Sequence, residues 1–293
     1  MAITRGISKL IFDNDGVNID SEDVAMRVMD DWGVALIKRY EPAKVPPQDF
    51  IYKTYPGTST DKIVEALIKK FDLPVALIKQ DYNLADDADV PVALADLITI
   101  ETNKRFQSEL KAIPGVTAVH DELRAGYGAE NIALATTSRA DRMNISLECA
   151  VDPVTGVNAR LAEFFPAGEL RRSGYDHANK YDEAFTALGW EPADTVVVED
   201  SLSGVTKAKQ GRPDVRVVGT VAAKFYEDKP AQAKALLDAG ANLVIANFSD
   251  LPKAIAWLND GMDANKKPDF AGQVFVPSAV AVKPQAAPKP ALS

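Results

Sequence analysis

Short apolar segments that end abruptly at polar residues recur along the chain. They are rich in Val, Ile and Leu, and runs of this length are typical of strands buried on both faces of a parallel sheet. Segments with the spacing of amphipathic helices lie between them. This alternation predicts an open α/β sheet covered by helices on both faces. The apolar runs occupy residues 7–12, 131–135, 195–198, 215–218 and 243–246, and the helical segments occupy residues 116–125, 143–149, 181–188 and 204–210.

The stretch from residue 21 to residue 112 interrupts this alternation. It contains helical patterns without strands, at residues 21–38, 60–71 and 91–111. Ser21 is expected to act as the N-cap of the first of these helices. A helical block inserted after the first strand predicts a second, smaller domain.

The C-terminal region has a different composition. After residue 260 the chain becomes rich in Pro, Ala and Lys without a sustained period, so we expect residues 256–293 to form an appendage whose last dozen residues are disordered or adopt polyproline II structure. Within it, the segment FAGQVFV is a candidate edge strand.

The charge balance and the scarcity of His and Cys narrow the chemistry. The chain has 42 acidic and 33 basic side chains and a net charge of −9, which argues against a nucleic-acid surface because such surfaces need clustered Lys and Arg. One cysteine, Cys149, excludes an internal disulfide framework and a multi-cysteine metal site. No apolar run approaches the roughly 20 residues that a membrane-spanning helix needs. We therefore expect a cytoplasmic protein whose chemistry depends on carboxylates.

Two acids follow the first apolar run, in the segment LIFDNDGVNIDS. Asp13 is expected at the end of the strand and Asp15 on the loop above it, where Gly16 allows a sharp turn. Such a pair can hold a hard cation and supply a nucleophilic carboxylate beside a carboxylic acid. The alternative is a solvated loop after a buried strand.

Polar residues also follow two later strands. Hydroxyl groups follow the second run, where a helix N-terminus would favour a phosphate. Adjacent acids follow the third run, and they would repel the first pair unless a cation lay between them. Because the carboxyl ends of parallel strands share one sheet edge, these groups are expected to meet there. They are Thr136, Thr137, Ser138, Glu199 and Asp200, and Lys180 lies at the start of the helix before the third run.

The chain resembles the haloacid dehalogenase-like hydrolase superfamily in four features that occur in the same order: FDNDGVNIDSE, ALATTSR, a lysine and VVVEDSLSGV. The resemblance extends from about residue 8 to residue 251 and is greatest to the β-phosphoglucomutase-like phosphatase branch. It implies a Rossmann-like α/β core formed by residues 1–20 and 113–255. It also implies a helical cap domain of residues 21–112, with residues 256–293 as an appendage.

The resemblance implies phosphoryl transfer through an aspartyl-phosphate. Asp13 would be the nucleophile, and Asp15 would protonate the leaving oxygen and then deprotonate water. The cofactor Mg2+ would be held by Asp13, the backbone carbonyl of Asp15 and Asp200, with support from Glu199. Lys180 would neutralise charge on the nucleophile and the phosphoryl group.

The resemblance also suggests residues that bind the substrate. Thr137 or Thr136 would bind the phosphoryl group, with the spacing favouring Thr137, and Ser138 is a neighbour. In the cap, the segment YPGTST resembles a loop that reaches the leaving group, so its candidates are Gly57, Thr58 and the nearby Lys53. The alternative for this loop is a Pro-Gly turn in which Ser59 or Thr60 caps the next helix.

The lysine departs from the usual pattern. The downstream Leu188-Gly189 places Tyr175 at the customary lysine position, and Lys180 comes about one and a half helical turns later. Arg171 or Arg172 is an alternative source of positive charge. His177 lies close to Lys180, and we regard it as incidental.

These features predict a phosphatase for a small phosphorylated metabolite, such as a sugar or sugar-acid phosphate, in a monomer or weak homodimer. The alternative is a phosphosugar mutase, although the mutases of this branch carry a cap histidine at the position of Ala25. A dehalogenase would lack the second acid at Asp15. A non-catalytic interaction protein on the same fold has no evident need for all four acids.

Overall fold

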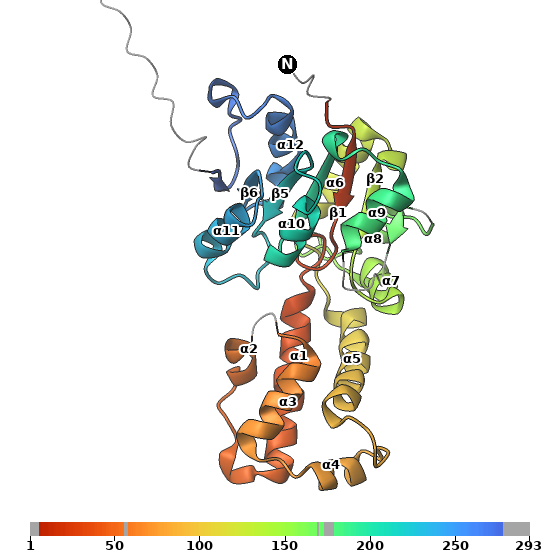
Figure 1. Cartoon of the computed structure of the whole chain (residues 1–293), viewed down its shortest axis with the longest axis vertical. Helices are drawn as coiled ribbons and strands as arrows, with labels where there is room; N and C mark the ends of the chain where they lie inside the picture. The colour runs from red at the N-terminus through yellow and green to blue at the C-terminus, as the bar shows by residue number, and fades with distance from the viewer. Residues whose placement is uncertain (1–5, 56–57, 169, 173–178, 278–293) are drawn as a thin grey trace, which may run out of the picture.

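The computed structural model describes residues 6–55, 58–168, 170–172 and 179–277. Within them, one seven-stranded sheet has the order β3-β2-β1-β4-β5-β6-β7, in which only β7 runs antiparallel. Figure 1 shows β1 near the middle of this sheet. The strands are β1 (Lys9–Phe12), β2 (Ile132–Ala135), β3 (Arg171–Arg172), β4 (Thr195–Glu199), β5 (Arg216–Thr220), β6 (Leu243–Ile245) and β7 (Val274–Phe275).

The middle residues of each central strand are apolar because both faces of the sheet are covered by helices, and polar residues stand at or next to the strand ends. Alternate side chains of β1 enter different clusters: Leu10 and Phe12 on one face, Ile11 on the other. The first cluster includes α6 (Val116–Tyr127), α7 (Ala140–Cys149), α8 (Leu161–Phe164) and α12 (Leu251–Asn259), and the second includes α9 (Lys180–Leu188), α10 (Leu202–Lys209) and α11 (Lys229–Asp238). This doubly wound α/β core confirms the predicted fold class.

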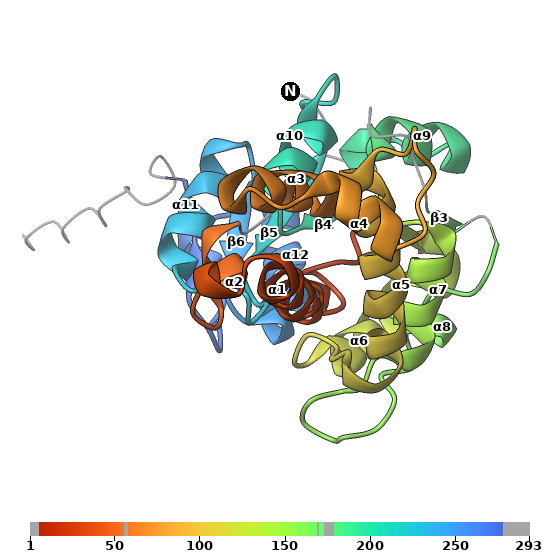
Figure 2. The same cartoon turned by 90° about the horizontal axis from the view of Figure 1, so that it is seen from below.

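The chain leaves the core after β1 and forms helices only, in the described residues, before it returns. Figures 1 and 2 show these helices at the end of the core where β1 finishes. They share a separate apolar cluster that includes Met29, Ile37, Leu67 and Ile98. The two connecting segments pair with each other at Ile19 and Ala112. The cap helices are α1 (Ser21–Tyr40), α2 (Phe50–Thr54), α3 (Thr60–Phe71), α4 (Val75–Asp81) and α5 (Val90–Glu109).

Three details differ from or extend the sequence expectations. Asp20, and not Ser21, occupies the N-cap position of α1, so the expectation for Ser21 was wrong. Ser21 is instead the first helical residue, and its hydroxyl donates to Asp15. The segment FAGQVFV contributes the edge strand β7. Helix α12 continues to Asn259, past residue 255, where the core was expected to end.

Short 3-10 turns connect several elements. They are η1 (Pro42–Lys44), η2 (Ala129–Asn131), η3 (Pro192–Asp194), η4 (Phe248–Asp250) and η5 (Ala264–Lys266). Among the described helices, none combines the length and apolar character that crossing a membrane requires.

Candidate active site

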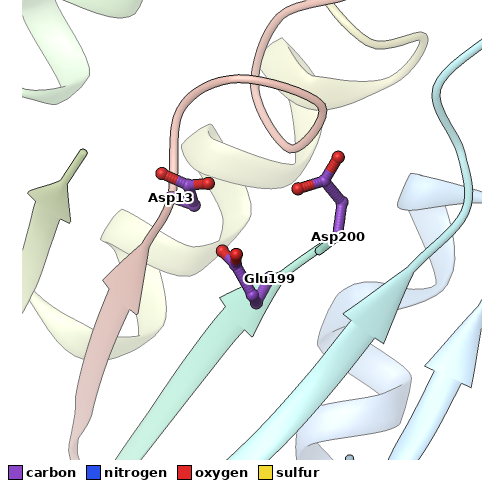
Figure 3. A group of neighbouring side chains, drawn as sticks. All are labelled: Asp13, Glu199 and Asp200. Atoms are coloured by element: carbon purple, nitrogen blue, oxygen red, sulfur yellow. The ribbon is translucent and has the colours of Figure 1, made fainter. Parts of the chain in front are cut away.

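Three buried carboxylates converge where β1 and β4 end. Pairing of Phe12 with Val198 brings these strand ends level, and the Asp13 backbone N–H donates to the Val198 oxygen over 3.0 Å. Asp13 follows β1, Glu199 is the last residue of β4 and Asp200 comes next (Figure 3). One ligand atom from each of the three lies within 4.8 Å of the others. Adjacent parallel strands therefore assemble the acid cluster expected from the sequence.

Lys180 supplies a positive charge to this cluster. Its Nζ lies 2.7 Å from Asp13 Oδ1 and 3.5 Å from Glu199 Oε2, and its side chain is only 5% exposed. Asn179 fixes the start of α9, because its side-chain oxygen accepts from the backbone N–H groups of Tyr181 and Asp182. The position of this helix start brings Lys180 to Asp13.

The alternatives to Lys180 differ in where they lie. The Arg171 guanidinium donates to the Phe165 backbone oxygen over 2.6 Å and to Asn144, so Arg171 does not supply charge to Asp13. Tyr175, His177 and the side chain of Arg172 lie outside the described residues.

The electrostatics of the cluster suit a cation. Burial and the charge of Glu199 hold the pKa of Asp13 and that of Asp200 well above the usual range. Burial lowers the pKa of Lys180, but Asp13 and Glu199 outweigh it and leave that pKa raised. One lysine thus faces three carboxylates. Their oxygens are the ligands that Mg2+ prefers, so the residues fit a divalent cation that would offset the remaining repulsion.

Two glycines leave the space that the carboxylates occupy. A Cβ on Gly16, whose φ is +75°, would overlap the Asp200 carboxylate, and a Cβ on Gly204 would overlap that of Glu199. The other Glu199 contacts are a 3.1 Å hydrogen bond from the Tyr181 hydroxyl and a 2.5 Å hydrogen bond from the Ser201 hydroxyl. Close backbone approach therefore helps to set the positions of both acids.

Asp15 lies beside the cluster with its own hydrogen-bond partners. Its Oδ1 accepts from the Ser21 hydroxyl over 2.5 Å, and its Oδ2 accepts from the Ser138 hydroxyl over 2.7 Å. Arg142 places an Nη atom 3.6 Å from Oδ1. Burial raises the pKa of Asp15, but Arg142 and the two hydroxyls outweigh burial and lower it. These contacts favour the ionised carboxylate.

The two threonines after β2 have different surroundings. Thr136 is buried, and its hydroxyl lies 3.5 Å from Asp15 Oδ2. It also accepts the backbone N–H of Ser138 over 3.1 Å. Thr137 is exposed. The structure therefore turns Thr136 toward Asp15 and leaves Thr137 exposed, whereas the sequence spacing favoured Thr137 for the phosphoryl group.

A cavity of about 850 Å³ opens from the acid cluster toward the cap. Tyr52 and Lys53 of α2 line it on the cap side, and Lys53 remains 66% exposed, 3.8 Å from Asp49. Thr58 is not among the described residues that line this cavity, and Gly57 lies outside the described residues. Of the two cap candidates that the structure describes, Lys53 lines this cavity and Thr58 does not.

Several side chains at the site were missed by the sequence analysis. The Tyr181 hydroxyl donates to Glu199, and the Tyr226 hydroxyl donates to Asp200. Arg142 contacts Asp15. Their positions follow from packing between distant segments, and we find no sequence signal that would have identified them.

Comparison with known proteins supports the assignment of the fold. The model of the haloacid dehalogenase-like hydrolase family matches residues 8–211. The comparison with curated proteins finds no match.

Solved structures match over most of the chain. A haloacid dehalogenase-like protein of unknown function from Agrobacterium tumefaciens is 25% identical, with a TM-score of 0.61, over 86% of this chain and 99% of that one. A HAD hydrolase from Entamoeba histolytica is 16% identical, with a TM-score of 0.62, and the match covers 87% of this chain and 100% of that one. A HAD family hydrolase from Deinococcus radiodurans with bound phosphate and sodium is 22% identical, with a TM-score of 0.56, and the match covers 85% of this chain and 95% of that one. By the family match and this fold, the chain belongs to the haloacid dehalogenase-like hydrolase family.

Proposed function

We propose that this protein is a Mg2+-dependent phosphatase that hydrolyses a small phosphorylated metabolite, a sugar or sugar-acid phosphate, through an aspartyl-phosphate. The observation that carries the proposal is the setting of Asp13. This buried carboxylate lies 2.7 Å from Lys180 and forms a cluster with Glu199 and Asp200. The cluster opens into a cavity of about 850 Å³, large enough for a small metabolite.

In the first half of the reaction, an Asp13 oxygen bonds to phosphorus while the bond from phosphorus to the ester oxygen breaks. Lys180 lowers the pKa of Asp13 against the effect of burial, which favours the ionised nucleophile, and it offsets negative charge on the phosphoryl oxygens. The Thr136 hydroxyl is the candidate donor to the phosphoryl group. A proton on Asp15 passes to the leaving oxygen, which departs as an alcohol.

In the second half, Asp15 accepts a proton from water, and the water oxygen attacks the phosphorus of the aspartyl-phosphate. The bond from Asp13 to phosphorus breaks, inorganic phosphate leaves and the proton remains on Asp15 for the next cycle. The hydrogen bonds from Ser21 and Ser138 favour ionised Asp15, which suits its role as the base. To act as the acid, Asp15 must take up a proton and exchange these contacts.

Asp13, Asp200 and the backbone carbonyl of Asp15, with support from Glu199, would hold Mg2+. When bound, this ion supplies positive charge to the phosphoryl oxygens as the transition state forms.

The test is phosphate release from p-nitrophenyl phosphate and a metabolite panel, with and without Mg2+. We expect release only with Mg2+, and none from Asp13→Asn, which keeps the shape of the side chain but removes the nucleophile. Asp87→Asn, an exposed change on the cap, is the matched control. Turnover that survives in Asp13→Asn would refute the assignment of the nucleophile.

A mutase would use the same chemistry but return the phosphoryl group to the sugar. Ala25, where the resemblance places a cap histidine in mutases, lies on α1 and has no group that transfers protons. We therefore favour hydrolysis. Incubation with a hexose 1-phosphate and its bisphosphate activator checks this choice, because formation of the 6-phosphate without free phosphate would identify a mutase.

We also propose a cytoplasmic location and a monomer or weak homodimer, with a small molecule as the partner. A lone cysteine is consistent with a reducing compartment. Sedimentation at increasing protein concentration tests the oligomeric state.

A further inference from the structure

Tyr226 contacts an expected metal ligand from a distant part of the chain. Its hydroxyl donates to Asp200 Oδ2 over 2.7 Å and lies 3.1 Å from the Asp200 backbone oxygen. Tyr226 belongs to the segment 221–228, which connects β5 to α11, and none of the motifs in the sequence includes it. The Tyr226 side chain also lines the cavity over the acid cluster.

Asp200 is held from several directions. On one side, a Cβ on Gly16 would overlap its carboxylate, so the loop after β1 closely approaches that group. The Gln232 side chain donates to the Asp200 backbone oxygen over 3.1 Å. Gln232 restrains the Asp200 backbone and the loop at Gly16 restrains one face of its carboxylate, so the hydrogen bond from the Tyr226 hydroxyl completes the restraint on this side chain.

The segment that carries Tyr226 is itself fixed against the cap. The Lys224 backbone N–H donates to Asp20 Oδ2 over 3.2 Å. The Phe225 ring packs against Tyr52 of α2, with 5.9 Å between the ring centroids. These contacts hold the residues on the N-terminal side of Tyr226, so its hydroxyl has a defined place above Asp200.

We propose that Tyr226 is a positioning residue that holds the Asp200 carboxylate in the orientation required to bind a divalent cation. The inference rests on the proposed function only in taking Asp200 as a metal ligand. A carboxylate that rotates freely must lose that freedom when it binds a metal, and an existing hydrogen bond removes much of this cost. Outer-shell partners of this kind raise metal affinity about 10- to 100-fold.

The test is calorimetric titration of the full-length protein with MgCl2 in the absence of substrate. Tyr226→Phe removes one oxygen and keeps the ring, so we expect the Kd for Mg2+ to rise about tenfold or more. Tyr127→Phe is the matched control, because Tyr127 is half-buried at the end of α6, on another part of the core. Thermal unfolding without Mg2+ checks that each variant is folded.

Turnover of p-nitrophenyl phosphate provides the second measurement. We expect Tyr226→Phe to need more Mg2+ for half-maximal rate and to recover most of its kcat at saturating Mg2+. A Kd within about twofold of the wild-type value would overturn the inference. A loss of kcat that saturating Mg2+ does not restore would also overturn it, because the hydroxyl would then act on the reaction and not on the metal ligand.

The two proposals fail separately. If Tyr226→Phe weakens Mg2+ binding but the wild-type protein hydrolyses no phosphate ester, the inference stands and the proposed function fails. If the wild-type protein releases phosphate but binds no Mg2+, the inference is overturned.

Discussion

Replacing His120 by Gln is expected to make the free energy of unfolding less sensitive to acid. His120 is fully buried on α6, and the rings of Phe12, Phe164 and Phe165 surround its imidazole at centroid distances of 4.8, 5.2 and 5.0 Å. An apolar site of this kind disfavours the charged imidazolium.

The hydrogen bonds place a proton on Nε2 of the His120 ring. Asn18 donates its side-chain N–H to the Asp13 backbone oxygen, so Asn18 Oδ1 is an acceptor, and His120 Nε2 donates to it over 2.8 Å. His120 Nδ1 is buried and has no hydrogen-bond partner among the described residues. Burial and the charge of Arg124 lower the pKa of His120 to about 3.

This lowered pKa determines the sign and size of the effect. Below pH 6.5 the unfolded chain protonates this histidine while the folded protein does not, so acid favours unfolding until about pH 3. From a pKa of about 6.5 unfolded and about 3 folded, lowering the pH from 7 to 5 costs about 2 kcal/mol through this group.

The assay is urea denaturation of the wild-type protein and His120→Gln at a series of pH values. Gln keeps a donor for Asn18 but does not titrate, so the free-energy difference between the two proteins should shift by about 2 kcal/mol between pH 7 and pH 5. Between pH 7 and pH 9 the difference should stay constant, because the histidine is neutral in both states. If acid lowers the free energy of unfolding equally in both proteins, the pKa of His120 is not strongly lowered and the reasoning is refuted.

Three further results are expected. Gly33→Ala should cost about 1–3 kcal/mol in chemical unfolding, because its Cβ would overlap the Ile51 side chain, whereas Gly126→Ala, with open space around it, should cost nothing. Lys180→Met should lower kcat/KM for p-nitrophenyl phosphate about a hundredfold or more, since it removes the cation beside Asp13, and a value near that of the exposed control Lys234→Met, which lies outside the cavity lining, would contradict this role. Added Mg2+ should raise the Tm of the wild-type protein and leave that of Asp200→Asn almost unchanged; equal rises would argue against this ligand.

The alternation of strands and helices in the core could be predicted because its central strands are buried on both faces and read as short apolar runs. All five predicted apolar runs contain strands, and the longer helices show a clear period. Six helices and strands of the described residues were missed: β3, α2, α4, α8, α11 and α12. The first four have only two to seven residues, too short to show a period. Ser21 was misread because α1 begins one residue earlier than expected, with Asp20 at the N-cap. The Ser21 hydroxyl donates to Asp15 and does not accept from the backbone N–H groups of the first turn, which the local sequence does not reveal.

The sequence by itself determined which carboxylates stand at the strand ends. Buried parallel strands need apolar residues along their length, so the acids that follow them mark one edge of the sheet. Only the tertiary structure decided what surrounds those acids. The resemblance named Lys180 with Arg171 and Arg172 as alternatives, and helix packing brings Lys180 to Asp13. Tyr226, which no motif includes, reaches Asp200 across 26 residues of chain because of how the loop after β5 packs. Packing likewise decides that Thr136 turns inward after β2 while Thr137 is exposed.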